Sequence, residues 1–363
     1  GRYNGPFQKG GLVFRDSSGF GNVSVGGYMD HEFENFQNTK STFDQHRWII
    51  NIGAELHERL RFYSEYEIEH GGPDAEGGSG EAKVEQAYVE YLIAEPVNIR
   101  GGAILAPFGR TNIYHDSDLR DLTDRSIVDR DIIPTTWTEA GVGLFGSFYP
   151  EVGNSSWEIK YDAYVVNGLD DGFSDTGLGG AKNSLSSDNN NNKAFVGRLV
   201  VSPALGHELG FSGYHGKYNT FDDDISGFGF DWLTTWGDFE FTGQYAFFDV
   251  DEPAGMDVAN RFEGVNAELH YHFWPEFLNN TYMGRDFEDP KLTLVGAYSW
   301  GQIDDDSDAG FGDNEEERYT LGLNYRPVEN FVFKLEYQWN DTENEALERG
   351  NNNGFISSAA MGF

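Results

Sequence analysis

The chain contains no cysteine among its 363 residues. This absence excludes disulfide frameworks, thiolate catalysis and metal sites built from cysteine. No run approaches the roughly 18–20 consecutive apolar residues that a membrane-spanning helix requires, and the mean hydropathy is -0.55. A membrane location is still possible, because the strands of a β-barrel alternate polar and apolar residues and so cancel the hydropathy signal.

Positive charge is also scarce, with 25 Lys and Arg against 61 Asp and Glu, which gives a net charge of -36. Because nucleic-acid binding depends on neutralising phosphates with Lys and Arg, this balance argues against a nucleic-acid partner. Proline is rare at 11 residues, whereas glycine numbers 46 and aromatic residues make up 15%. Such a composition is typical of β-rich chains with many turns. No nucleophile elbow, phosphate-binding loop or dinucleotide fingerprint is present, so the sequence does not predict an enzyme.

Alternation of apolar and polar residues is the dominant pattern. In the stretch "FVFKLEYQWN" (331–340), Phe333, Leu335 and Tyr337 fall on one face of a strand, and Lys334 and Glu336 fall on the other. Similar segments recur about every 20–25 residues, and the separators between them are alternately short and long. Among the long separators are residues 110–138 and 167–192. The pattern predicts about 16 antiparallel strands with tight turns at one end and long loops at the other.

A soluble β-sandwich or propeller also produces alternating strands. It does not explain the persistent asymmetry of short turns and long loops, which is expected where all tight turns lie on one side of a membrane. The chain also ends in the alternating segment "FISSAAMGF", with Phe363 as its last residue. A final strand that ends in an aromatic residue resembles the C-terminal signature of outer-membrane barrels. We therefore predict an all-β protein in which residues 1–363 form a single transmembrane antiparallel β-barrel, integral to the outer membrane of a Gram-negative bacterium and in contact with its lipid.

The stretch "KVEQAYVEYLIAEPVNIRGGAILAPFG" (83–109) resembles the phosphate-selective porin O and P family. The resemblance lies in "AYVEY" (87–91), Arg100 and "PFG" (107–109), and it continues in "RSIV" (125–128) and "TEAGVGLFG" (138–146). It implies a 16-stranded porin, a homotrimer, with short periplasmic turns, long extracellular loops and a third long loop folded inward to narrow the pore. The insert at 274–290 is then expected on the periplasmic side.

The candidate pore residues follow from this plan. The constriction loop (110–138) carries charges of both signs that could set a transverse field across a narrow pore or pair with each other and fix the loop to the wall. Its candidate residues are Arg110, His115, Asp116, Asp118, Arg120, Arg125 and Arg130. The inward positions of the strands predict a pore lining of Arg47, Arg61, Glu65, Glu67, Arg100, Lys160, Asp162, Arg198, Lys334 and Glu336. Because acidic residues predominate on the inward face, phosphate specificity does not follow from the resemblance.

The acidic loop "DDDSDAGFGDNE" (304–315) offers one candidate metal site. Asp304, Asp306, Asp308 and Glu315 occupy positions 1, 3, 5 and 12 of a calcium-loop pattern. The pattern's glycine stands one residue late, so the alternatives are a structural Ca²⁺ site and a solvated loop, and no other cofactor is predicted.

The sequence thus predicts a passive diffusion porin for small hydrophilic solutes and ions. The alternatives are a channel selective for phosphate or small carboxylates, and a structural or adhesive barrel.

Overall fold

The computed structural model describes residues 12–15, 21–73, 80–182, 185–252, 259–304, 314–342 and 352–363. Nearly all of its regular structure is β. The first half of the barrel sheet contains β2 (Asn22–Phe36), β3 (Thr42–His57), β4 (Leu60–Glu69), β5 (Glu81–Ala94), β6 (Val97–Leu105), β7 (Thr138–Phe148), β10 (Glu158–Val166) and β11 (Ala194–Ala204). The second half contains β12 (His207–Lys217), β13 (Asp224–Trp236), β14 (Phe239–Val250), β15 (Arg261–Phe273), β16 (Lys291–Asp304), β17 (Asn314–Val328), β18 (Phe331–Thr342) and β19 (Gly354–Gly362).

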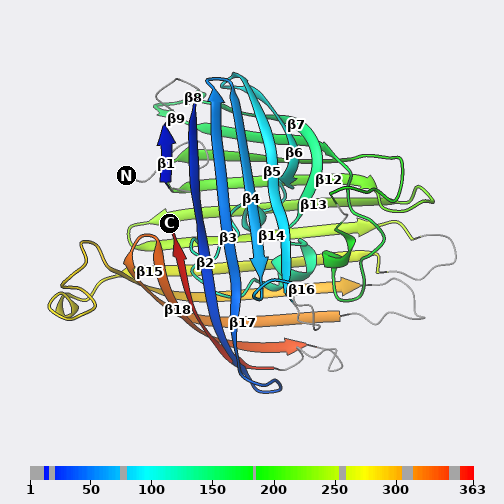
Figure 1. The fold of residues 1–363 in the computed structure, drawn as a ribbon. Helices are drawn as coiled ribbons and strands as arrows, with labels where there is room; N and C mark the ends of the chain where they lie inside the picture. Colours follow the sequence, from blue (N-terminus) through cyan, green and yellow to red (C-terminus); the bar gives the residue numbers. More distant parts are fainter. Residues whose placement is uncertain are drawn as a thin grey trace.

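These strands form a closed antiparallel β-barrel in which each strand pairs with its neighbours in sequence (Figure 1). The ring closes between β19 and β2, where Gly354 lies opposite Phe36 and Gly362 lies opposite Tyr28. The short strand β1 (Leu12–Arg15) pairs with the start of β2, beyond the point where β19 ends. Closure leaves no open sheet edge, as a hydrocarbon environment requires. The prediction of a barrel of about 16 strands is confirmed.

The two ends of the barrel differ as the sequence predicted. Tight two-residue turns join β3 to β4, β5 to β6, β11 to β12, β13 to β14 and β17 to β18. Glycine with positive φ serves two of these turns, Gly206 at 79° and Gly237 at 59°, a conformation that other residues rarely adopt. The link between β7 and β10 adds a small hairpin, β8 (Glu151–Val152) with β9 (Ser155–Ser156). The insert at 274–290 also lies on the short-turn end and projects from the sheet at the left of Figure 1.

Side-chain exposure follows the alternation of residues 331–340. Phe333, Leu335 and Tyr337 are exposed on the outer face of β18, while Lys334 and Glu336 are buried inside. An outer face of aromatic and aliphatic residues matches the lipid-facing band of a membrane barrel.

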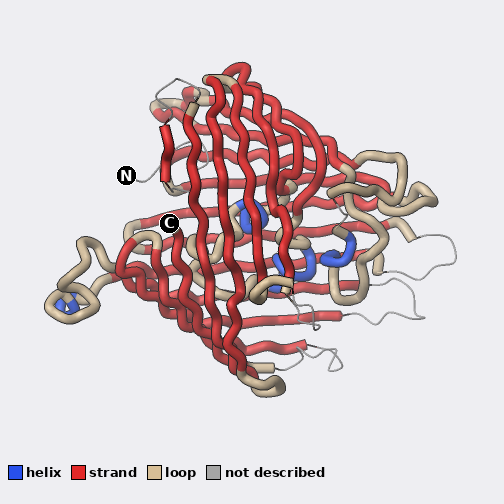
Figure 2. The backbone as a smooth tube through the Cα atoms, viewed as in Figure 1, coloured by secondary structure: helices blue, strands red, loops and turns tan. Residues whose placement is uncertain are grey.

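Helical structure in the described residues is limited to four short segments, α1 (Arg110–Ile113), η1 (Val128–Ile132), η2 (Leu178–Ala181) and η3 (Glu276–Leu278). None of these helices has the length and apolar character needed to cross a membrane. Figure 2 shows η3 in the projecting insert and the other helical segments within the outline of the sheet. The first two belong to the loop between β6 and β7, which lies inside the barrel.

Candidate functional site

The β6–β7 loop (106–137) is attached to the barrel wall by buried charges on β18. The Lys334 ammonium donates to the carbonyl oxygens of Ser117 (2.6 Å) and Leu122 (3.3 Å). The Glu336 carboxylate accepts from the backbone N–H groups of Thr123 (2.7 Å) and Asp124 (3.3 Å). Lys334 and Glu336 are each only 2% exposed. Their charged groups are used to hold the loop, and their role in lining the pore stays a prediction.

Two arginines of β17 extend this attachment. Arg318 donates to the Asp124 carboxylate at 2.6 Å, and Arg326 donates to that of Asp121 at 3.1 Å. The His270 ring on β15 also lies 2.9 Å from the Asp121 carboxylate. Burial alone raises the pKa of the Asp121 carboxyl, but the partners His270 and Arg326 outweigh it and hold that pKa well below its usual range. Asp121 is thus an ionised anchor of the loop.

The start of the loop reaches across to β12 and β14. The Gly109 N–H donates to the Ser212 hydroxyl, and the Arg110 N–H donates to the Gln244 side-chain oxygen, both at 3.1 Å. Asn112 joins the two ends of the loop, since its amide donates to Ala106 O at 2.8 Å and accepts from Trp137 N–H at 2.8 Å. The loop leaves β6 and returns to β7, and its bonds to β17 and β18, which lie across the ring from these strands, place it across the interior. The prediction of an inward-folded third loop is confirmed.

A hydrophobic core inside the barrel was not foreseen from the sequence. Phe108, Val128, Ile132 and Trp137 of the loop pack on inward-facing apolar residues of the barrel wall, such as Phe248. Residues of the next long loop, Leu169, Leu178 and Ala181, complete this cluster. Residues 169–181 of this loop therefore also fold inward. The signal available in the sequence was the run of apolar inward positions, such as Tyr164, Val166, Ala194 and Val196, on the strands that flank it.

The predicted constriction residues fall into two groups. Most are paired: Arg110 with Glu208, Arg130 with Asp131 and Glu316, and His115 with Glu85 at 2.7 Å. Asp116 lies 3.7 Å from His115, and Asp118 accepts through its backbone oxygen from Arg326 at 2.8 Å. These residues therefore pair with each other and with the wall, as in the alternative in which the charges fix the loop instead of setting a transverse field.

Arg120 and Arg125 form the second group. In the described part of the chain, neither guanidinium lies within 4.0 Å of a carboxylate; Arg120 donates to Asp124 O, and Arg125 to Thr135 O and the Thr136 hydroxyl. Burial, with the nearby Arg47 and Arg120 guanidinium groups, lowers the pKa of Arg125 to about 10. Neither arginine therefore forms a contact ion pair in the described residues, although Asp129 and Glu85 lie near enough to Arg125 to oppose this lowering.

The two larger of the cavities that border the loop, among the described residues, have charged linings. One of about 290 Å³ is lined by Arg120 and Arg125 from the loop and by Glu240 and Glu268 from β14 and β15. The other, of about 450 Å³, is lined by Arg100, Lys160, Asp162, Arg198 and Glu208 on the wall. Tyr114 and Leu119 of the loop line both cavities. Charged groups of both signs therefore face the space that the loop leaves open.

The remaining predicted lining residues all belong to ion pairs or hydrogen bonds of the wall. Arg47 contacts Glu67 (3.3 Å) and Glu69, and Arg61 lies 3.9 Å from Glu55 and Glu90. Arg100 binds Glu90 (2.8 Å), and Arg198 pairs with Asp231. Lys160 pairs with Glu158 (3.0 Å), and the Glu65 carboxylate accepts from the Tyr63 hydroxyl. Of these, Arg47, Glu65 and Glu67 are buried among their partners, whereas Arg198 is buried but also lines the 450 Å³ cavity. Arg61, Arg100, Lys160 and Asp162 keep exposed surface.

The candidate calcium loop is only partly described. Asp306 and Asp308 lie outside the described residues. Asp304 ends β16 opposite Arg261, and the Glu315 carboxylate accepts from Trp300 Nε1 at 2.7 Å. The structural Ca²⁺ site stays a prediction.

Comparison with known protein families identifies the family to which this chain belongs. The model of the phosphate-selective porin O and P family matches residues 22–233, more than half of the chain. The chain belongs to this family. A curated relative, an uncharacterised protein of Aquifex aeolicus (strain VF5), is 39% identical over 149 residues, or 40% of this chain. The match spans about a third (32%) of that relative's length.

Solved structures support the fold. OmpT of Vibrio cholerae superimposes with a TM-score of 0.61 at 11% identity and covers 97% of this chain and 100% of its own. An anion-selective porin from Comamonas acidovorans gives 0.57 at 12% identity, covering 94% of this chain and 99% of its own. OmpF of Salmonella typhi gives 0.61 at 13% identity, covering 97% and 100%. This member of the porin O and P family is therefore an integral outer-membrane β-barrel, and its family and fold are those of a channel rather than of an enzyme.

Proposed function

We propose that the chain is a passive diffusion channel for small hydrophilic solutes and ions, narrowed by residues 106–137. The observation that carries this proposal is the 290 Å³ cavity, where Arg120 and Arg125 of the loop share a lining with Glu240 and Glu268 of the wall. A rigidly attached loop gives the passage a fixed width, and charges of both signs favour polar over apolar solutes. No large apolar binding pocket lies beside the loop in the described part of the interior.

Charges of both signs border this cavity on the loop side. The loop contributes Arg120 and Arg125 together with Asp121, Asp124 and Asp129, and the wall contributes Glu240 and Glu268. Charged groups that border a narrow aqueous gap orient polar solutes and lower the barrier to their passage. Arg120 and Arg125 have no carboxylate within 4.0 Å among the described residues, so their donors are the most available to a passing solute.

Solute flux tests this proposal. Proteoliposomes that contain the purified protein are expected to admit small sugars and amino acids at rates that fall steeply with solute size. Uniform exclusion of all such solutes, with the barrel folded, would contradict diffusion and would favour a structural or adhesive role. Glu240→Gln and Glu268→Gln are expected to raise anion permeability relative to cations, because they remove two carboxylates that border the cavity. Glu95→Gln, which removes an exposed carboxylate of the β5–β6 turn, is the matched control.

A second candidate is a channel that prefers anions such as phosphate or small carboxylates. It is favoured by Arg120 and Arg125, the two loop arginines without a carboxylate within 4.0 Å in the described residues. Reversal potentials in a salt gradient separate the two candidates. Anion preference that disappears in Arg120→Gln and Arg125→Gln would support the second candidate, and cation preference in the wild type would exclude it.

We also propose that the channel is a homotrimer. One of the similar solved structures is described as the trimer form of OmpT of Vibrio cholerae. Chemical cross-linking of the detergent-solubilised protein is expected to stop at three copies. A monomer at all protein concentrations would contradict this assembly.

A further inference from the structure

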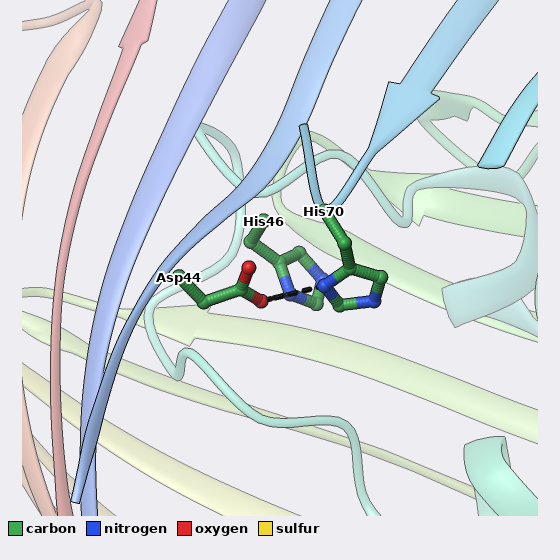
Figure 3. Close-up of side chains that lie close together, drawn as sticks. All are labelled: Asp44, His46 and His70. Carbon is green, nitrogen blue, oxygen red and sulfur yellow. Dashed lines mark hydrogen bonds and ion pairs between the residues drawn. The ribbon is translucent and has the colours of Figure 1, made fainter. Parts of the chain in front are cut away.

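Two histidines and an aspartate converge at the long-loop end of the barrel, outside the site described above. The side chains of Asp44, His46 and His70 place one potential ligand atom each within 4.8 Å of one another (Figure 3). All three are partly exposed, at 24%, 27% and 37%. We propose that they form a binding site for a divalent transition-metal ion of the Zn²⁺ class. The site is independent of which solute the channel carries.

A β-bulge in β3 brings two of the ligands to the same side. Asp30 lies opposite Arg47, but Glu32 lies opposite Asp44, so β3 contains one residue more than β2 over this interval. In a regular strand, His46 and Arg47 would point to opposite faces. The extra residue turns His46 inward beside Asp44, while Arg47 still faces its inward partners Glu67 and Glu69.

The side chain of Gln45 stabilises this bulge. Its amide donates to the carbonyl oxygens of Asp30 at 3.0 Å and Arg47 at 3.2 Å, two oxygens at the irregular point of the ladder. The position of His46 is thus built into the backbone, as expected of bulges that direct a side chain towards a site.

His70 approaches from the end of β4. Its backbone N–H donates to the His46 carbonyl oxygen at 3.1 Å, which extends the β3–β4 ladder by one step. Its φ of 50° lies in the left-handed region, which few residues other than glycine adopt. This conformation places its ring against the Asp44 carboxylate, with His70 Nδ1 and Asp44 Oδ2 2.7 Å apart.

The distances fit a small metal ion. Two ligands bound at about 2.1 Å with tetrahedral angles lie roughly 3.4 Å apart. His46 Nδ1 is 3.5 Å from Asp44 Oδ2 and 3.5 Å from Glu32 Oε2. The His70–Asp44 contact of 2.7 Å must lengthen by less than 1 Å. The two histidines and Asp44 thus give a set of two nitrogens and one oxygen, which leaves the fourth position of a tetrahedral Zn²⁺ ion to water.

The Asp44 carboxylate is available, whereas neighbouring carboxylates are occupied. Glu67 and Glu69 pair with Arg47 and Lys83. In the part of the chain that the structure describes, Asp44 has no lysine or arginine nitrogen within 4.0 Å; its ion-pair partners are His46 and His70. A divalent cation would therefore meet negative charge that no fixed cation at contact distance neutralises.

Calorimetric titration of the detergent-purified full chain with Zn²⁺ alone tests the site. One saturable site per chain is expected. His46→Ala and His70→Ala are each expected to weaken Zn²⁺ binding by more than the roughly 10–100-fold that loss of an outer-shell partner costs. His31→Ala is the matched control, because His31 lies on the adjacent strand and is exposed on the outer face. It should leave binding unchanged.

Three results would overturn the proposal. They are the absence of saturable Zn²⁺ binding to the wild type, equal affinity in the wild type and in both site variants, and tighter binding of Ca²⁺ than of Zn²⁺, which would indicate an oxygen-only site elsewhere. Single-channel conductance of each variant, measured without metal, verifies that the barrel is folded. Because His70 is partly exposed at the strand end, His70→Ala keeps the test valid if His46→Ala fails to assemble.

Discussion

At the scale of single residues, buried charge inside this barrel has a structural role. Lys334 and Glu336 lie two positions apart on one strand and bind four backbone groups of the same loop, residues 117–124. Hydrogen bonds to charged groups are stronger than those between neutral groups, and a buried charge that loses its partner is costly. The inward charges of β18 therefore fix the loop and with it the width of the passage.

Removing Lys334 tests this role. Lys334→Ala leaves the carbonyl oxygens of Ser117 and Leu122 without their donor and is expected to destabilise loop attachment by about 1.5–3 kcal/mol. Single-channel recordings should show larger and noisier conductance. Lys160→Ala, which removes a half-exposed lysine elsewhere on the wall, is the control. Unchanged current noise in Lys334→Ala would show that the loop does not depend on this ammonium.

Asp129 gives the loop a dependence on pH. This side chain is 3% exposed, and burial raises the pKa of its carboxyl to about 6, despite hydrogen bonding from Ser126 and the nearby Arg125. Because the pKa of Asp129 in the folded protein lies above the ordinary aspartate value of 3.8, the folded state binds the extra proton between these two values. Stability therefore falls as pH rises from about 4 to about 6.

Asp129→Asn removes this titration while its amide oxygen can still accept from Gln244, which donates to Asp129 in the wild type. The melting temperature of Asp129→Asn minus that of the wild type is expected to be positive at pH 8 and to decrease as pH falls through about 6. A difference that is constant from pH 8 to pH 4 would mean that Asp129 does not titrate in this range.

At the scale of secondary-structure elements, local alternation was sufficient to predict most strands. The segment 331–340 corresponds to β18 (Phe331–Thr342), 156–166 to β10 (Glu158–Val166), and 193–202 to β11 (Ala194–Ala204). This succeeds because an inward-polar, outward-apolar strand has a period of two that any window detects. The tight turns were equally predictable, since their glycines and short lengths are local features of the sequence.

Features that depend on contacts between distant residues were not predictable. The bulge in β3 changes the face of Asp44 and His46 without any interruption of the sequence pattern. The inward packing of residues 169–181 rests on contacts such as Asn314 Nδ2 to Asp175 O at 3.0 Å, which join segments far apart in the chain. The charged residues at 110–137 indicated a pore constriction. Whether each side chain faces water or an ion-pair partner depends on residues of the opposite wall, which the local sequence does not show.

The outer face of β18 gives a prediction at this scale. Leu335 is exposed to lipid near the middle of its strand, and Leu335→Arg is expected to cost roughly 2–4 kcal/mol of folding stability, as for charges near the bilayer midplane. Urea unfolding in lipid vesicles measures this cost. Leu335→Met, which keeps the side chain apolar, should change stability by less than about 1.5 kcal/mol. An equal cost for both substitutions would place Leu335 away from the lipid.

At the scale of the whole molecule, a closed barrel with an internal loop reconciles two properties that seem opposed. The chain carries a net charge of -36, yet it resides in a membrane. The alternation separates the two requirements, because charged side chains face the interior or lie in the long loops while aromatic and aliphatic side chains face lipid. Inside, an apolar cluster fills one side of the lumen, and charged groups of both signs border the remaining cavities.

Planar-bilayer recording of the purified wild-type protein tests the central claim, that this barrel conducts, most directly. The structure predicts discrete, stable conductance steps that increase with salt concentration, together with the noisier steps of Lys334→Ala. A correctly folded and inserted protein that produced no conductance steps at any salt concentration would contradict the account.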